Sequence, residues 1–332
     1  MLTISDLVYK IDQRRLFDNA SVVLPAGSKT GFVGRNGSGK TTLFRLILHE
    51  MLPDDGDIEV HPRAKVGTVP QEAPVSPDSV LDMVLKADTE RHRLLREAES
   101  ATDGHRIAEI HTRLIDIDAH SAEARASSVL RGLGFSHDRQ KTPCSELSGG
   151  WRMRVALAGV LFAKPDLLLL DEPTNYLDLE GTLWLENYLA SYPYTVFMIS
   201  HDRGLLNRAV NSIIHLENGK LTFYRGNYDT FENTRRMQRE LAGKTREKAL
   251  DRIAHLQSFV DRFRAKATKA KQAQARMKMI EKMRPPEALN EEAALPFSFP
   301  NPKKAMASPM LDFENVAVGY TDEPVLKKLN LR

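Results

Sequence analysis

The sequence has very little cysteine and no long hydrophobic run. Cys144 is the one cysteine in 332 residues, so no disulfide can form within the chain, which fits a reducing compartment. The longest strongly apolar stretch, near Leu167–Leu170, is far shorter than the ~18 residues that a membrane-spanning helix needs. The N-terminal residues MLTISDLVYK lack the basic and then apolar segments of a secretory signal. We therefore expect a soluble, cytoplasmic protein.

The chain as a whole also lacks a large net charge, although one segment is strongly basic. The whole chain carries only +3. Residues 235–284 hold 16 Lys and Arg against five Asp and Glu, a local charge of +11, so the remainder carries 3 − 11 = −8. Residues 262–279 contain seven cations and no acid. This concentration of unpaired positive charge predicts a polyanionic partner.

A glycine-rich motif begins at Gly34. The sequence GRNGSGKT matches G-x-x-x-x-G-K-[ST], follows a short apolar run and precedes a helical pattern of hydrophobic residues. Glycines let backbone N–H groups approach phosphate oxygens, and the N-terminus of the following helix adds partial positive charge. Lys40 would reach the β- and γ-phosphates, and the Thr41 hydroxyl would bind Mg²⁺. The predicted ATP-binding residues are Gly34, Arg35, Asn36, Gly37, Ser38, Gly39, Lys40, Thr41 and Thr42.

Two acids follow a second apolar segment. Leu167–Leu170 predicts a strand that is buried on both faces of a parallel sheet, and such strands present ligand-binding residues at their carboxyl ends. Asp171 suits Mg²⁺ coordination, and Glu172 suits polarising the attacking water.

A further anion site is predicted about twenty residues earlier. Ser148 can cap the helix that follows it, and the two glycines after it leave the first helical amides open. The segment consists of Leu147, Ser148, Gly149 and Gly150.

The order and spacing of these motifs, from Met1 to about Phe231, resemble those of ATP-binding-cassette ATPases. The resemblance implies an α/β fold of the P-loop ATP-binding-cassette type. Its parts are a mainly parallel sheet core, an antiparallel β subdomain and a helical subdomain at about residues 72–165. The family usually stacks adenine on an aromatic residue near the N-terminus. The favoured register here puts Ile11 at that position, with Tyr9 nearby. Trp151 and Tyr176 replace a common Gln and His, and neither change removes a phosphate or Mg²⁺ ligand.

The resemblance also implies roles for matching residues. Gln71 would contact Mg²⁺ and the attacking water, so the implied metal ligands are Thr41, Gln71 and Asp171. Catalysis would involve Glu172, His201 and Gln71, with His201 holding the γ-phosphate. Ser148 and Gly150, in the signature segment 147–150, would contact ATP held by an opposite cassette, and Asp178 would couple the two sites.

The segment between Gln71 and the signature predicts helices of mixed charge over roughly residues 80–133. Its four histidines have no acid or cysteine partners at ligand spacing, so we interpret them as surface residues. They are His92, His105, His111 and His120.

The last residues repeat the first. Residues 311–332, LDFENVAVGYTDEPVLKKLNLR, resemble residues 2–24, LTISDLVYKIDQRRLFDNASVVL, and each predicts a strand, a turn and a strand. In the cassette family this pair precedes the phosphate loop. The second copy places Tyr320 in the register of Ile11 and ends at Arg332. We therefore expect a truncated second cassette over residues 310–332, and an ATPase that needs the complete second cassette for full activity.

The basic segment predicts a helical hairpin. Residues 244–284 contain no Gly or Pro, and Ile253, Leu256, Val260 and Phe263 form one apolar stripe. A second stripe of Met277, Ile280 and Met283 could pack against the first, with a turn near residues 264–268. The predicted domains are a first cassette at 1–234, this linker with its Pro-containing connector at 235–309, and the second-cassette strands.

Two cassettes joined by a cationic linker resemble the ABC-F ATPases, as do AKATKAKQAQAR at residues 265–276 and YRGNYDTFE from Tyr224. That resemblance implies action on the ribosome, with the linker contacting rRNA and P-site tRNA and with ATP turnover gating release. The implied RNA-binding residues are Arg262, Arg264, Lys266, Lys269, Lys271, Arg276 and Lys278.

Two other functions stay open at this point. A nucleotide-binding subunit of a transporter would partner separate membrane proteins and would not need a long cationic linker. A DNA-repair or chromosome ATPase would bind duplex DNA and would usually carry zinc cysteines or a much longer coiled coil.

Overall fold

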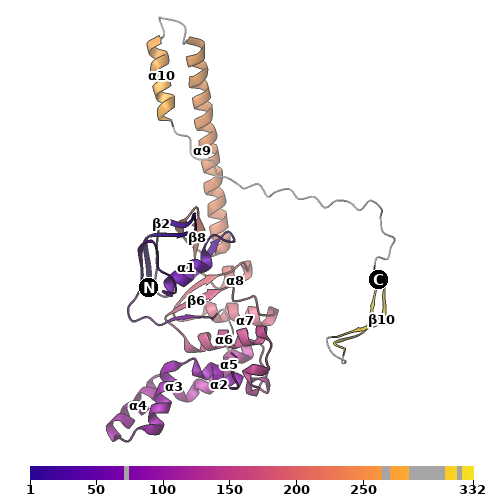
Figure 1. Cartoon of the computed structure of the whole chain (residues 1–332). Coiled ribbons are helices and arrows are strands. Elements are labelled where there is room, and N and C mark those ends of the chain that lie inside the picture. Colours follow the sequence, from indigo (N-terminus) through magenta and orange to yellow (C-terminus); the bar gives the residue numbers. More distant parts are fainter. Residues whose placement is uncertain (71–74, 264–269, 284–310, 320–323) are drawn as a thin grey trace. The chain divides into compact units, whose positions relative to one another are not determined.

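The computed structural model describes residues 1–70, 75–263, 270–283, 311–319 and 324–332. The chain divides into two compact units, Met1–Lys244 and Thr245–Arg332. The first unit contains the three-stranded and six-stranded sheets and most of the helices, and the second contains the distal part of α9 (Tyr228–Phe263) with α10 (Ala270–Lys282) and a two-stranded β-hairpin (Figure 1).

A six-stranded sheet forms the centre of the first unit, in the order β5-β6-β7-β3-β8-β9. All neighbours are parallel except β8 and β9, which are antiparallel. The middle strands are short runs of apolar residues that are buried along their length, as expected when helices or a second sheet cover both faces. The strands are β3 (Lys29–Gly34), β5 (Val66–Thr68), β6 (Leu167–Asp171), β7 (Thr195–Ile199), β8 (Ser212–Glu217) and β9 (Lys220–Arg225).

An antiparallel sheet packs against one side of this core. It consists of β1 (Leu2–Ile11), β2 (Arg14–Leu24) and β4 (Asp55–Val60), in the order β2-β1-β4. Three stacked or tilted rings, Phe32, Phe44 and Phe197, fill the space beneath α1 (Lys40–Ile47), with ring centres 5.2–6.4 Å apart. This aromatic cluster supports the helix that begins at the glycine-rich motif.

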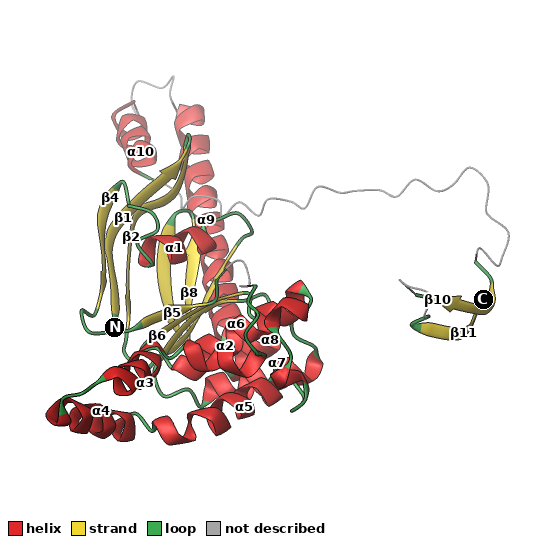
Figure 2. Cartoon of the chain, turned by 60° about the horizontal axis from the view of Figure 1, so that its bottom comes forward, coloured by secondary structure: helices red, strands yellow, loops and turns green. Residues whose placement is uncertain are grey.

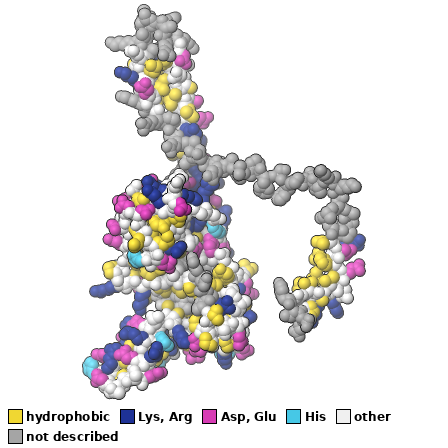
Figure 3. Space-filling model, in the orientation of Figure 1, with side chains coloured by type: hydrophobic (Ala, Val, Ile, Leu, Met, Phe, Trp, Pro, Cys, Tyr) yellow, Lys and Arg dark blue, Asp and Glu magenta, His cyan; other side chains and the backbone are white. Residues whose placement is uncertain are grey.

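Helices cover the other side of the core sheet (Figure 2). Helices α3 and α4 pack on each other through a small core of Leu94, Ile110 and Leu114 and project as an arm. Acidic and basic side chains are interspersed over this face of the arm (Figure 3). His105, His111 and His120 are exposed there, and His92 is partly buried. The helices are α2 (Val80–Lys86), α3 (Thr89–Ser100), α4 (Gly104–Asp116), α5 (Ala122–Gly132), α6 (Gly149–Ala163), α7 (Leu179–Ala190) and α8 (Arg203–Arg208), with short 3₁₀ turns at Ala119–Ser121, Arg139–Lys141 and Cys144–Glu146.

Two helices follow the last core strand, α9 (Tyr228–Phe263) and α10 (Ala270–Lys282). Figures 1 and 2 both place α10 beside the distal part of α9. Ile253 and Leu256 are partly buried and Val260 is 2% exposed, as the predicted apolar stripe requires. Among the α10 residues, Met277 is 40% exposed and therefore contributes less to packing than its predicted partners Ile280 and Met283, which are partly buried.

Part of the predicted RNA-binding set falls outside the described residues. This applies to Arg264, Lys266 and Lys269, which lie between α9 and α10. Of the others, Lys278 is exposed and Arg276 is partly buried. The predicted turn at 264–268 lies within the same undescribed segment.

The β-hairpin of β10 (Phe313–Val318) and β11 (Leu326–Leu331) repeats the irregularities of β1 and β2. Asp6 has φ 49° and Asn315, which is 309 residues later in the chain, has φ 52°, so both adopt a left-handed backbone. At the same offset, the Asp6 amide donates to Ser21 Oγ at 2.8 Å and the Asn315 amide donates to Asn330 Oδ1 at 2.6 Å. The two hairpins therefore share their bulges as well as their sequence pattern.

The faces of the two hairpins differ in what covers them. Phe17 is fully buried in the first unit, whereas Leu326, its counterpart 309 residues later, is 53% exposed. Strand β1 pairs with β4 as well as β2, whereas β10 pairs only with β11 among the described residues.

Candidate nucleotide-binding site

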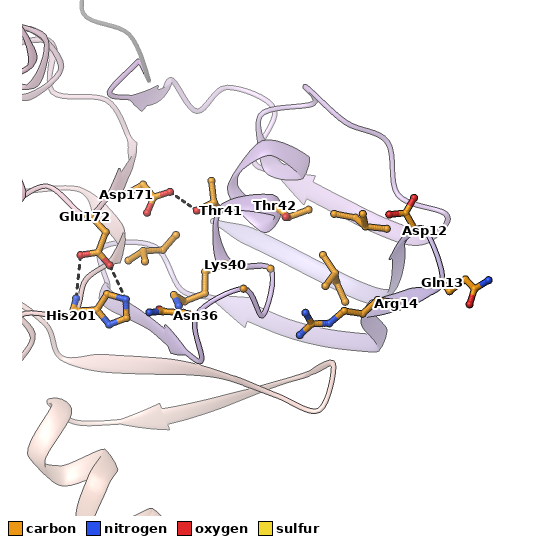
Figure 4. Close-up of a pocket in the computed structure, with 15 residues that line it drawn as sticks. Asp12, Gln13, Arg14, Asn36, Lys40, Thr41, Thr42, Asp171, Glu172 and His201 are labelled. Atoms are coloured by element: carbon orange, nitrogen blue, oxygen red, sulfur yellow. Dashed lines mark hydrogen bonds and ion pairs between the residues drawn. The ribbon is translucent and has the colours of Figure 1, made fainter. Parts of the chain in front are cut away.

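A pocket of about 720 Å³ lies at the carboxyl ends of the core strands, where the glycine-rich motif meets the β1–β2 turn. The residues that line it come from four places in the sequence and are drawn in Figure 4. They are Ile11, Asp12, Gln13, Arg14 and Leu16; Asn36, Gly37, Gly39, Lys40, Thr41 and Thr42; Asp171 and Glu172; and Ile199 and His201.

The loop from Gly34 to Lys40 requires glycine at specific places. Gly39 has φ 107°, and a Cβ there would lie 3.2 Å from Leu16 Cδ1. At Gly34 a Cβ would lie 3.0 Å from the Leu216 carbonyl oxygen and 3.1 Å from Ser38 Oγ. Glycine at these positions lets the backbone fold tightly in front of α1, and loops of this kind direct N–H groups at an anion bound at the helix N-terminus.

Two groups in the loop are suited to an anion. Burial lowers the pKa of Lys40, and the nearby Glu172 and Asp171 carboxylates partly offset that effect. The Lys40 ammonium donates to the carbonyl oxygens of Gly34 at 2.8 Å and Arg35 at 3.1 Å. The Ser38 hydroxyl is buried and has no hydrogen-bond partner among the residues that the structure describes. A phosphate oxygen would satisfy both groups better than the loop does.

An oxygen-rich edge adjoins the loop. Thr41 Oγ1 donates to Asp171 Oδ2 at 2.7 Å, which joins the first turn of α1 to the end of β6. Hydroxyl and carboxylate oxygens are ligands that Mg²⁺ prefers. The third predicted metal ligand, Gln71, lies outside the described residues.

Glu172 and His201 face each other across the ends of β6 and β7 (Figure 4). The His201 amide donates to Glu172 Oε2 at 3.3 Å, and His201 Nε2 lies 3.3 Å from Glu172 Oε1. Glu172 adopts a left-handed backbone with φ 47°, an unfavourable conformation for a residue with a side chain. The structure thus brings together Lys40, Thr41, Asp171, Glu172 and His201.

Ile11 and Tyr9, the two residues considered for the adenine position, lie differently with respect to the pocket. Ile11 lines the pocket, whereas Tyr9 is 9% exposed and its hydroxyl lies 3.9 Å from Met51 Sδ. None of the described lining residues is aromatic apart from His201. Arg14 extends from the β1–β2 turn toward the glycine-rich loop (Figure 4).

The signature residues do not line this pocket. Leu147 is buried, Ser148 and Gly149 are exposed, and Gly150 is partly buried. Ser148 stands at the N-cap position of α6 with extended backbone, but its side chain makes no capping hydrogen bond. The predicted capping role of Ser148 is therefore wrong. Its main chain holds the first turn instead, through the Ser148 carbonyl and the Arg152 amide at 3.0 Å.

Asp178 connects the signature helix to α7. One carboxylate oxygen accepts from the Gly181 amide at 2.9 Å and caps α7, and the other accepts from Arg154 Nη1 at 3.1 Å. The Gly181 amide and then Arg154 lower the pKa of Asp178. Arg154 Cζ also lies 4.4 Å from the ring centre of Trp151, and Arg139 Cζ lies 3.9 Å from it.

The sequence reasoning missed Arg154 and Arg139. Their one available signal was the unusual Trp151 after the signature, because the face of an indole ring favours stacking with arginine.

Comparison with known proteins gives a consistent picture. Two family models described as ABC transporter match residues 17–175 and residues 214–299. The chain is 43% identical to the probable ATP-binding protein YheS of Escherichia coli K12, over 100% of this chain and 52% of the relative. It is 39% identical to ATP-binding cassette sub-family F member 3 of Homo sapiens, over 94% of this chain and 45% of the relative. The chain thus spans about half the length of these curated relatives.

Two solved structures share the fold. One is described as the ATP binding subunit of an ABC transporter, with a TM-score of 0.53 and 18% identity over 70% of this chain and 92% of that one. The other is the ATP-binding cassette MJ0796 bound to ADP and Pi, with a TM-score of 0.50 and 21% identity over 68% of this chain and 98% of that one. These similarities confirm the predicted cassette architecture. In the described part of the chain, no helix is long and apolar enough to cross a membrane.

Proposed function

The chain belongs to the ATP-binding-cassette family, sub-family F, and from that premise we propose that residues 1–234 bind ATP with Mg²⁺ and hydrolyse it to ADP and phosphate. The observation that carries the proposal is the 2.7 Å contact between Thr41 Oγ1 and Asp171 Oδ2, two oxygen donors that are held beside the phosphate loop. The unpartnered Ser38 hydroxyl and the buried Lys40 ammonium fit a phosphate group next to such a cation.

Each residue has a separate part in the proposed reaction. Mg²⁺ held by Thr41, Asp171 and Gln71 would neutralise charge on the phosphate oxygens. The backbone amides of residues 34–42 and the Lys40 ammonium orient the β- and γ-phosphates. The Glu172 carboxylate orients and polarises the attacking water. His201, whose amide already bonds to that carboxylate, holds it in place and reaches the γ-phosphate.

The binding part of the proposal is tested by titration with a fluorescent ATP analogue, with and without EDTA. We expect Mg²⁺-dependent binding that Asp171→Asn weakens by at least tenfold, since it removes a charged ligand. Asp57→Asn, on an exposed position of β4, is the matched control and should bind like the wild type. Equal affinities for all three proteins would contradict the assignment of the metal site.

Full activity would require a second cassette. The signature at 147–150 lies outside the pocket of its own cassette, which supports a role against ATP on an opposite one. We therefore propose that residues 310–332 begin a second cassette and that Asp178 links the two sites. Turnover per molecule of the present chain should rise with protein concentration. Constant turnover by a monomer, abolished in Glu172→Gln, would refute this requirement.

The finer proposal is that the basic linker at 235–309 binds rRNA and P-site tRNA on the ribosome, and that ATP turnover gates its release. The seven cations of residues 262–279, which have no acid among them, support this reading of the hairpin. Contact with four to six phosphates would make log affinity fall with log salt at a slope of roughly −3 to −5.

The ribosome proposal is tested by co-sedimentation of the two-cassette protein carrying Glu172→Gln, with ATP, at two salt concentrations. Neutralising Lys266, Lys269 and Lys271 to Gln should reduce ribosome association and lower the salt slope by about three. The matched control neutralises three exposed cassette cations, Lys10, Arg63 and Lys220. Association that is insensitive to the linker changes would refute RNA recognition, and recovery with membranes would favour a transporter subunit.

A further inference from the structure

The helix after His201 is tied closely to the nucleotide pocket. Asp202 follows His201 directly, and its carboxylate caps α8 by accepting from the amides of Gly204 at 2.7 Å and Leu205 at 3.2 Å. Leu205 is fully buried, so α8 sits firmly in the core. The His201 amide bonds to Glu172 at 3.3 Å, so one hydrogen bond separates the start of α8 from a carboxylate that lines the pocket.

The first residue of α8, Arg203, contacts the beginning of α9 in three ways. Its Nη2 donates to Asp229 Oδ1 at 2.9 Å and to Glu232 Oε2 at 2.8 Å. Its Cζ lies 5.3 Å from the ring centre of Tyr228. One turn further along α8, Asn207 Oδ1 accepts from the Asp229 amide at 2.9 Å. One face of α8 therefore holds the first turn of α9.

Neighbouring residues of the same part of α9 anchor it in the core, and the Phe231 ring centre lies 5.8 Å from that of Tyr228. Phe231 is 4% exposed and its ring centre lies 5.0 Å from Tyr224 and 5.2 Å from His215. Arg235 and Arg239 both pair with Glu217 at the end of β8. These contacts fix α9 to the sheet through residues that do not line the pocket, whereas the Arg203 contacts join it to the helix that follows His201.

The exposure of these side chains indicates that the Arg203 contacts set the orientation of α9 rather than the stability of the fold. The Arg203 side chain is 60% exposed, and those of Asp229 and Glu232 are 54% and 52% exposed. Ion pairs at such positions add little to stability. Two carboxylates and a ring around one guanidinium do, however, define the orientation of the first turn of α9.

We propose that Arg203 is a positioning residue that transmits the occupancy of the nucleotide site from the His201 loop through α8 to the first turn of the linker helix α9. This proposal rests on the proposed nucleotide-binding function. It adds a defined physical connection between that site and the linker, made by side chains outside the pocket.

Hydrogen exchange of the present chain tests the connection. Exchange of peptides from residues 226–240 is measured with and without Mg²⁺ and the slowly hydrolysed analogue ATPγS, and affinity is measured by titration. We expect nucleotide to change wild-type exchange there by about fivefold. Arg203→Ala should remove that nucleotide-dependent difference while leaving affinity within about twofold. Arg203→Lys, which keeps the charge but not the planar group, should restore part of it.

The matched control is Arg106→Ala, which also removes an arginine paired with two carboxylates, at 2.7 Å to Glu97 and 2.9 Å to Glu109, but on the arm. It should leave the difference intact. A purely structural role for Arg203 would shift exchange equally in both states, which overturns the inference. Wild-type protein that binds nucleotide without any change in residues 226–240 also overturns it, with the proposed function still standing. Failure of the wild type to bind nucleotide overturns both.

Discussion

The left-handed backbone of Glu172 predicts that this residue lowers the free energy of unfolding relative to a glycine at the same position. With φ 47°, the Cβ of any residue other than glycine lies close to the following carbonyl, which costs about 1–2 kcal/mol. Glu172→Gly removes that cost, and Glu172→Ala keeps it. Comparing Gly with Ala cancels the loss of the carboxylate, since both variants lack it.

The magnitude follows from two opposing effects. Relief of the left-handed conformation favours Gly by about 1–2 kcal/mol, whereas the larger freedom of Gly in the unfolded chain costs about 0.5–1 kcal/mol. With the midpoints of these ranges, about 1.5 and about 0.75 kcal/mol, the net gain of Glu172→Gly over Glu172→Ala is about 0.75 kcal/mol. For a unit of the size of Met1–Lys244, this corresponds to a rise in Tm of about 2 °C.

The assay is thermal unfolding of both variants without nucleotide, with His49 as the control position. His49 has φ 57° and follows α1, where the amide of Glu50 donates to the Arg45 carbonyl at 2.9 Å in a left-handed helix ending. The Tm of His49→Gly should exceed that of His49→Ala by a similar margin, and both His49 variants should still hydrolyse ATP. Refutation would be a Glu172→Gly protein no more stable than Glu172→Ala while the His49 pair behaves as expected.

Three further predictions concern other parts of the first unit. Lys40→Ala should weaken ATP binding by at least tenfold without lowering Tm, because the Lys40 ammonium bonds only to loop carbonyls; unchanged affinity in a titration would contradict its role. Burial lowers the pKa of His215 to about 4, so the unfolded chain binds more protons between about pH 6.5 and 4. Denaturant unfolding should show that the free energy of unfolding decreases as the pH is lowered through this range, by up to about 1.4 kcal/mol per pH unit. An equal slope in His215→Gln would disprove this. Gly132→Ala would place a Cβ 2.0 Å from Trp184 Cε2 and should cost about 1–3 kcal/mol of unfolding free energy, whereas wild-type stability would show that Trp184 moves aside freely.

Features set by neighbouring residues in the sequence could be predicted. The glycine-rich loop between β3 and α1 and the acids at the end of β6 follow from local apolar runs and glycine positions, and the structure places both at one pocket. Ile11 also lines that pocket, whereas Tyr9 packs inward against Met51, and the adenine contact itself stays a prediction.

Features that depend on distant side chains could not be predicted. The contact of Arg203 with Glu232 spans 29 positions in the sequence, and that of Arg154 with Asp178 spans 24. In each case the arginine looks like any other in the sequence until the fold supplies its partner. The wrong prediction for Ser148 has a similar origin: its residue type favours a cap, but the orientation of its hydroxyl is decided by the surroundings of the helix end.

The β10–β11 hairpin affects how this chain should be handled in solution. Within the described residues its strands pair only with each other and Leu326 is 53% exposed, and an apolar strand pair of this kind favours self-association at high concentration through contacts unrelated to nucleotide. A sedimentation experiment on the chain alone would then report oligomers that say nothing about paired catalytic sites. Deleting residues 311–332 distinguishes association through the hairpin from association through paired nucleotide sites, since the deletion removes the hairpin and leaves the phosphate loop and the signature in place.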